Sequence, residues 1–217
     1  MGNFFDPEGG IMKALSRIAD LAILNIVWMI CCIPVITAGA ATTALFDICL
    51  KMVKNRESYI VRGYVKSFKN NFKKATIIWI LMLVVVLVLG MDFRIMCYWE
   101  NDLRYPMLVL ILLALLLAVF VFVYVFALVA KFENTVLEYV KNAFFMSLKH
   151  FPATLVLVVI LGLQIYACLF VMANDQYLPI LVLFGGSAFT YLMAYVHQKV
   201  FKNYINEEEE ELATEEN

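Results

Sequence analysis

The stretch LAILNIVWMICCIPVITAGAATTALFDICLKMVK, residues 21–54, decides how the rest of the chain folds. It is apolar up to Pro34, carries small and hydroxyl residues around Gly39, and is then apolar again until a basic edge. Proline stops or kinks a helix, and about 20 apolar residues let a helix cross a bilayer. The pattern predicts two membrane helices, at about 16–36 and 40–53, folded back on each other around a polar turn.

The composition of the whole chain makes lipid its solvent. The 217 residues are 64% hydrophobic, whereas soluble domains are about 45–50% apolar. We therefore expect one membrane domain over residues 1–206. Four further apolar runs predict spans at about 75–98, 105–131, 152–173 and 178–201. The fold class is all-α: a polytopic membrane helix bundle of six transmembrane helices, or five if the short helix 40–53 does not span.

Two amphipathic linkers between the spans are predicted to be interface helices. In the first, 54–74, aromatic side chains recur every four residues and basic side chains fill the other faces. This spacing is typical of a helix lying flat on a membrane, with its cations towards phosphates. The residues expected at the interface are Arg62, Tyr64, Lys66, Phe68, Lys69, Phe72 and Lys73. Nucleic-acid binding is the alternative for such a segment, but its place between two spans favours the membrane. The second linker covers 132–150.

Charge predicts the orientation in the membrane. Six spans place both termini on one side, and 15 of the 17 Lys and Arg residues fall on that side, leaving Arg94 and Arg104 on the other. The positive-inside rule makes the terminal side cytoplasmic. The segment 207–217 holds seven of the 18 acidic residues, and we expect it to be a disordered acidic tail.

Asn25 and Asp47 are the polar side chains most costly to place in lipid, and they lie at comparable distances from the turn between their helices. One interpretation is a contact point for an ion or ligand. The other is a hydrogen bond that joins the first helix to the second. We favour the structural interpretation. The hypothesis to test is that Asp47→Leu leaves the protein inserted and folded; a large loss of insertion or of thermal stability in detergent would instead show a structural role.

Motifs for catalysis or cofactor binding are missing. The chain has no HExxH, no GxSxG with a plausible triad, no Walker sequence and no intramembrane aspartate pair. The five cysteines show no metal-ligand spacing and are expected to pack as small hydrophobic residues; a disulfide between Cys97 and Cys168 is the alternative for that pair. We expect no catalytic residue, no metal and no cofactor.

Several motifs in this chain resemble the YesL-like membrane proteins of Gram-positive bacteria. They are Asn25-x-x-Trp28, Pro34-x-x-Thr37-x-Gly39, Ala44-Leu45, Ser67-Phe68-Lys69-x-Asn71-Phe72-Lys73, and Phe132-x-Asn134-Thr135 with Ala143 and Pro152. The resemblance covers nearly the whole chain and implies a multi-pass protein of the bacterial plasma membrane. That family is a domain of unknown function whose genes often lie beside those for sugar-uptake transporters and glycoside-degrading enzymes. Asp47 stands where the family often has an uncharged residue, which favours the motif from Asn25 to Gly39 as the functional one.

The resemblance and the residues together lead to one functional expectation and one alternative. The expected function is a non-enzymatic accessory or regulatory component associated with carbohydrate uptake. Its expected partners are a bilayer with anionic headgroups and a sugar-transporter permease, with no nucleic acid. The alternative is a small-solute or ion transporter or channel in its own right. A conduit needs a continuous polar path, and the predicted spans hold few polar residues.

Overall fold

A computed structural model describes the backbone of residues 10–55, 59–99 and 103–215, and side chains from 12 to 204 apart from those gaps and residue 175. Every element in this part of the chain is a helix. In chain order they are α1 (Gly10–Cys32), η1 (Val35–Thr37), α2 (Ala38–Val53), α3 (Ile60–Tyr98), α4 (Arg104–Lys131), α5 (Val136–Lys149), α6 (Phe151–Ala173), η2 (Asp175–Tyr177), α7 (Leu178–Phe184) and α8 (Ser187–Glu215), where η marks a short 3-10 turn. Six stretches are long and apolar enough to cross a membrane, which confirms the all-α, polytopic helix bundle.

The helix α2 is the centre of this bundle. It packs against α1, α3, α4 and α8, and side chains such as Leu45 and Cys49 are fully buried. Its 16 residues span about 24 Å, less than the roughly 30 Å of a hydrocarbon core. Neighbouring helices therefore cover most of a segment that is short for a span, as expected from the position of the stretch 21–54.

The helix α3 differs from the prediction of a separate interface helix. It runs without a break over 39 residues, because no proline or glycine lies between Gly63 and Gly90 to bend it. The segment 62–74 is thus the first part of the same helix that forms the third span. Tyr64 also faces inward: it is fully buried, and its hydroxyl donates to the Ala41 carbonyl at 3.1 Å.

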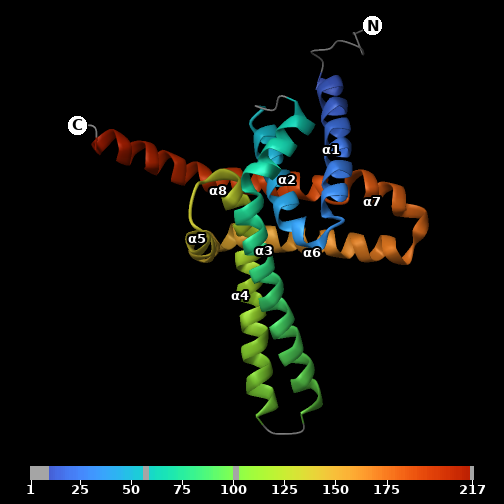
Figure 1. The fold of residues 1–217 in the computed structure, drawn as a ribbon, viewed down its shortest axis with the longest axis vertical. Coiled ribbons are helices and arrows are strands. Elements are labelled where there is room, and N and C mark those ends of the chain that lie inside the picture. The colour runs from blue at the N-terminus through green and yellow to red at the C-terminus, as the bar shows by residue number, and fades with distance from the viewer. Residues whose placement is uncertain (1–9, 56–58, 100–102, 216–217) are drawn as a thin grey trace.

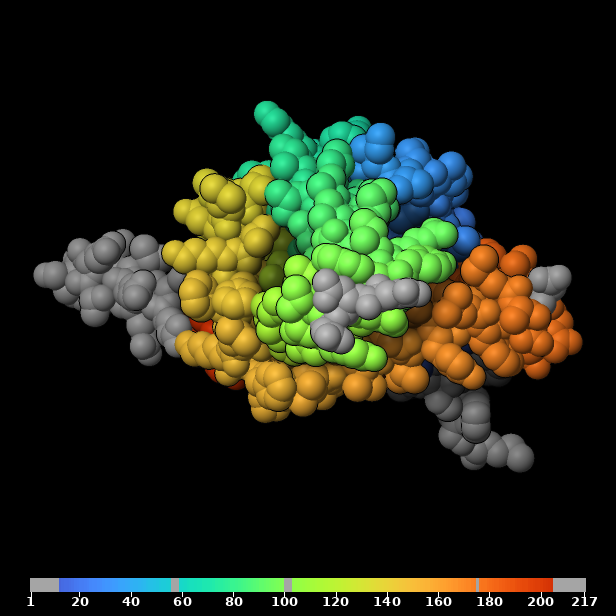
Figure 2. Space-filling view, turned by 90° about the horizontal axis from the view of Figure 1, so that it is seen from below, coloured from blue at the N-terminus to red at the C-terminus, as the bar shows by residue number. Residues whose placement is uncertain are grey.

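The apolar helices run in two directions. The far halves of α3 and α4 project from the body as a hairpin along the long axis, while α6 and α8 run from side to side through the body (Figure 1). Figure 2 shows the hairpin end-on, with α5 and α6 beside it. Most of its exposed side chains are apolar, for example Val84, Val88, Leu110 and Leu113, and the charged Asp92 and Arg94 are exposed near its far end. Such a surface fits contact with lipid better than contact with water.

The last predicted span is interrupted. The helix breaks at Gly185 and Gly186 between α7 and α8, so residues 178–201 do not form one straight element. The backbone of α8 then stays helical to Glu215, through most of the segment expected to be a disordered tail. Glutamate is a good helix former, which allows α8 to continue; residues 216–217 lie outside the described part. All five cysteines are free thiols.

Candidate functional site

Asn25 occupies the break between α7 and α8. Its side chain is fully buried and makes bonds in both directions along the interrupted helix. The amide nitrogen donates to the carbonyls of Leu181 and Val182 at 3.2 and 2.7 Å. The amide oxygen accepts from the backbone N–H groups of Gly186 and Ser187 at 2.8 and 2.9 Å. The Val182 carbonyl and the N–H groups of Gly186 and Ser187 are groups that lose helical partners where a helix ends, whereas the Leu181 carbonyl also accepts from the Gly185 N–H at 2.7 Å. Asn25 therefore takes the place of the missing backbone bonds.

Trp28 lies one helical turn further along α1 and fixes the same break. A Cβ atom built on Gly186 would come within 2.5 Å of the Trp28 ring, so only glycine leaves room for the indole. The indole nitrogen also lies 3.4 Å from the Thr42 hydroxyl on α2. The motif Asn25-x-x-Trp28 therefore joins α1 to two other elements through one face.

The second half of the motif shapes the turn from α1 into α2. The Thr37 hydroxyl donates to the carbonyls of Cys31 and Pro34 at 2.7 and 2.8 Å. A Cβ on Gly39 would lie 2.4 Å from the Trp79 Cβ, so glycine allows α2 and α3 to approach closely. The Trp79 indole donates to the Val35 carbonyl at 2.8 Å. The residues predicted as a functional motif thus form a joint between helices.

Asp47 makes a different contact from the one predicted. Its carboxylate pairs with Lys51, one turn along the same helix, at 2.7 Å. The Asp47 side chain is 15% exposed and that of Lys51 49%. The bonds of Asn25 go to α7 and α8, and the described ion pair of Asp47 stays within α2, so the predicted link from α1 to α2 through these two residues is wrong.

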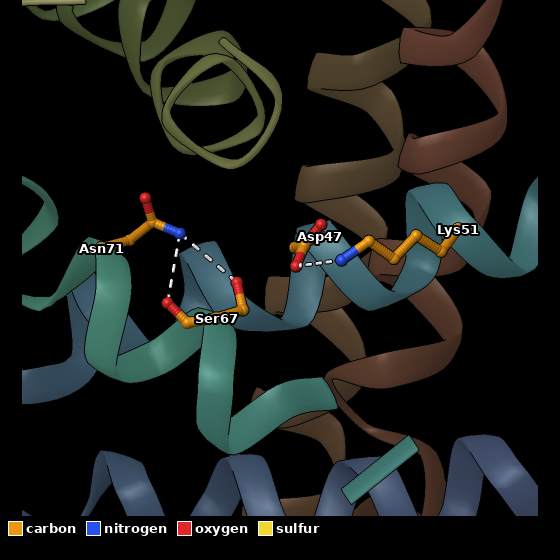
Figure 3. A network of polar contacts seen from close by, with 4 residues as sticks. All are labelled: Asp47, Lys51, Ser67 and Asn71. Carbon is orange, nitrogen blue, oxygen red and sulfur yellow. Dashed lines mark hydrogen bonds and ion pairs between the residues drawn. The ribbon is translucent and has the colours of Figure 1, made fainter. Parts of the chain in front are cut away.

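Asp47 and Lys51 line a polar cleft of about 530 Å³ between α2, the start of α3 and the turn from α4 to α5. Its charged residues are Asp47, Glu133, Lys51, Lys66, Lys74 and Lys131. Four lysines against two acids give the cleft, which we call the basic cleft, a surplus of positive charge. Figure 3 shows the pair on α2 beside a second polar pair on α3.

Two rows of side chains on α3 form one wall of the basic cleft. Lys66, Asn70 and Lys74 are spaced by four residues, and so are Ser67 and Asn71. Residues four apart share a helix face. The Asn71 amide donates to the Ser67 carbonyl and hydroxyl oxygens at 3.1 and 3.3 Å. A hydroxyl that accepts one bond still has its own proton to donate, so this wall offers neutral donors between cations.

The turn from α4 to α5 forms the opposite wall and is built by the motif at Phe132. The buried Tyr139 hydroxyl donates to the Phe132 carbonyl at 2.7 Å and accepts from the Asn134 N–H at 3.0 Å. Thr135 and Glu138 cap the start of α5 reciprocally. The Lys74 ammonium lies 6.0 Å from the centre of the Tyr139 ring, which holds that cation beside the cleft.

The remaining predicted interface residues occupy several environments. Phe68 packs against the core and Phe72 is 40% exposed. Arg62 and Lys69 line a second cavity between α1 and α3. Lys73 is exposed. The sequence pattern predicted that all these cations contact membrane phosphates, and it did not predict the basic cleft. The four-residue spacing of Lys66, Asn70 and Lys74 does indicate that these three side chains share one face of a helix.

His197 is another residue whose role the sequence did not reveal. It is fully buried. Its two ring nitrogens lie 2.8 Å from the Met193 carbonyl and 3.0 Å from the Val123 carbonyl, and the rings of Phe46 and Tyr124 pack edge-on against it. His197 therefore ties α8 to α4 inside the core.

Part of the chain matches a known family model. Residues 21–93 match a family described as "Protein of unknown function, DUF624". The matched stretch contains the joint made by Asn25, Trp28 and Gly39 and the two helices that carry one wall of the basic cleft. No curated protein and no solved structure matches the chain.

Proposed function

We propose that this multi-pass membrane protein is a non-enzymatic accessory or regulatory component of carbohydrate uptake, of the YesL-like type. The proposal places it in the bacterial plasma membrane with both termini in the cytoplasm, acting on a sugar-transporter permease. The link to carbohydrate rests on the resemblance of the motifs around Asn25, Ser67 and Phe132. The match of residues 21–93 to a family of unknown function is compatible with it.

One observation carries the choice of an accessory role over a conduit. Asn25, one of the two polar residues predicted to be most costly to place in lipid, uses both the oxygen and the nitrogen of its amide in hydrogen bonds to the backbone at the break between α7 and α8. A side chain saturated in this way has no free group for a passing solute. Asp47 is engaged by Lys51 at the basic end of the molecule. Asn25 and Asp47, the two residues considered for a contact with an ion or ligand, are therefore already engaged within the fold.

Broken helices also occur in transporters, where the freed backbone groups at the break bind substrate or ions. This is the specific observation that favours the alternative function, a transporter of its own. In the present chain the side chain of Asn25 fills those positions. The interrupted backbone between α7 and α8 therefore resembles that of a transport site, but the Asn25 side chain occupies the backbone groups that a substrate would bind.

The test is purification of the tagged full chain from native membranes in mild detergent, with mass spectrometry of the proteins that follow. An unrelated tagged multi-pass protein of the same membrane, purified in parallel, is the control. Recovery of a sugar-transporter permease in stoichiometric amounts with this chain alone supports the proposal. A clean preparation without a permease overturns it. Sugar or ion flux in vesicles that contain only this protein would establish the alternative.

A further inference from the structure

Two cavities meet at the start of α3. The basic cleft lies on one side of this helix, and a groove of about 860 Å³ lies on the other, between α3 and α1. The two cavities share the residues Tyr59, Ile60, Lys66 and Asn70. A single ligand that passes over Lys66 could therefore occupy both cavities. The residues that line each cavity indicate which part of such a ligand would bind there.

The basic cleft is suited to a phosphate group. Lys51 is engaged by Asp47 at 2.7 Å, which leaves Lys66, Lys74 and Lys131 with Glu133 as the other charged lining residues. Lysine binds phosphate as a point charge, and the hydroxyl of Ser67 adds a neutral donor between the cations. A carboxylate-only ligand would use fewer of these donors, because phosphate offers more acceptor oxygens.

The groove on the other side of α3 is suited to a hydrocarbon chain. Its apolar part is built from Ile23 on α1 with Ile60, Val61 and Val65 on α3, and Asp20 on α1 is the acidic residue of its lining. The large side chains remain accessible: Ile23 is 47% exposed and Val65 40%. Its cations, Arg62, Lys66 and Lys69, have long stems that lie along apolar surface while their charged ends stay at a polar boundary. Such a groove is open at the side and basic at its edge.

We propose that the two cavities together form a binding site for one phosphate-bearing lipid. The headgroup phosphate lies in the basic cleft against Lys66 and Lys74, and an acyl or prenyl chain passes over Lys66 into the groove beside Ile23. A free phosphate-bearing solute would fill the basic cleft alone and leave the groove unused. This site is independent of the accessory role proposed above, because it makes no use of a permease.

The experiment measures lipid binding to the purified full chain in detergent by native mass spectrometry. Phosphatidylglycerol is the test lipid, phosphatidylcholine is the comparison without net charge, and inorganic phosphate is added as competitor. Two variants remove the two halves of the site. Lys66→Gln combined with Lys74→Gln removes headgroup charge, and Ile23→Trp fills the groove. Lys141→Gln, on an exposed position of α5 outside both cavities, is the control for the loss of one surface charge and is also compared with Lys66→Gln alone.

The proposal predicts tighter binding of phosphatidylglycerol than of phosphatidylcholine. Loss of two charge-assisted contacts should weaken that binding about tenfold or more. Ile23→Trp should weaken lipid binding severalfold but leave competition by inorganic phosphate at the cleft unchanged. Lys141→Gln should bind as the unaltered chain does. Monodisperse gel filtration of each variant shows that it is folded, since all the altered side chains are at least partly exposed.

Three outcomes overturn the proposal. If Ile23→Trp has no effect while phosphate binds as tightly as the lipid, the ligand is a free phosphate compound. If Lys141→Gln weakens binding as much as the double variant, the attraction is general surface charge. If both lipids bind with equal affinity and the double variant binds phosphatidylglycerol as the unaltered chain does, the two cavities do not form a lipid site and hold only solvent or detergent.

Discussion

The side-chain oxygen of Asn25 lies 2.8 Å from the backbone nitrogen of Gly186, 161 residues further along the chain. This contact connects the first helix of the protein to the break between α7 and α8, and the Trp28 ring closes over the same glycine. Membrane helices can break only where other groups satisfy the freed backbone, because lipid offers no hydrogen bonds. The break in α7 and α8 therefore depends on a residue from the opposite end of the chain.

Substitution of Asn25 by leucine should destabilise the protein. Leucine has the same branching and number of side-chain heavy atoms but leaves two backbone N–H groups and two carbonyls at the break without their side-chain partner. An unsatisfied buried group costs about 1–3 kcal/mol, so we expect a loss of at least about 2 kcal/mol, seen as a lower thermal unfolding temperature in detergent. Gln164→Leu, at a partly exposed position of α6, is the control. Equal unfolding temperatures for the two variants would contradict the assigned role of Asn25.

The close approach of α2 and α3 at Gly39 gives a second prediction. In Gly39→Ala the new methyl group would lie 2.7 Å from the Ala75 carbonyl oxygen and closer still to the Trp79 Cβ. Both are held by the α3 backbone, so the helices must separate, and overpacking of this kind costs about 1–3 kcal/mol. Gly162→Ala is the matched control, because nothing lies within 4 Å of the added atom; there the better helix propensity of alanine should leave stability unchanged or higher. Thermal unfolding in the same detergent compares the two, and a Gly39→Ala protein as stable as Gly162→Ala would refute the close packing.

The features of the fold that the sequence predicts are those determined by local sequence patterns, namely the helices and their approximate positions. The apolar runs indicate the six candidate spans of the described residues, and the second half of the stretch 21–54 forms the central helix α2. The break at Gly185 and Gly186 could not be predicted, because the groups that satisfy it come from Asn25 on a distant helix. The absence of proline and glycine from residues 64–89 indicates that α3 continues past residue 74. The spacing of the aromatic side chains in the segment 62–74 instead led to the prediction of a separate interface helix.

The candidate site was predicted less completely. The basic residues of the segment 62–74 were recognised, but an amphipathic pattern on one helix does not reveal what packs against it. The opposite wall of the basic cleft comes from Glu133 and Tyr139, more than 55 residues later in the sequence. A cleft between segments distant in the sequence can be identified only from the tertiary structure. The spacing of Lys66, Asn70 and Lys74 indicates one wall of the basic cleft and does not indicate the other.

The pair of Asp47 and Lys51 should affect ligand binding more than folding. It is partly exposed, and pairs of this kind contribute about 0.2–1 kcal/mol. Asp47→Asn should therefore leave the unfolding temperature almost unchanged, while it releases Lys51 into the basic cleft and raises the affinity for phosphatidylglycerol severalfold. Asp92→Asn, at an exposed position on the projecting part of α3, is the control with the same change in charge. Equal gains in lipid affinity for both variants would mean that net charge, and not the cleft, controls binding.

The start of α5 should depend on pH through Glu138. The backbone N–H of Thr135 donates to the Glu138 carboxylate at 2.8 Å, and this bond lowers the pKa of Glu138 below its ordinary value of 4.5. A lowered pKa means that the bond stabilises the helix at any pH above the ordinary value, and that this stabilisation is lost as the pH falls through the pKa of the folded state. Amide hydrogen exchange over 136–140 should accelerate in that acidic range once corrected for its intrinsic pH dependence. Glu138→Gln keeps a capping side chain without the titrating proton and should show no such change. If the exchange of both proteins changes with pH in the same way, the carboxylate of Glu138 does not control the start of α5.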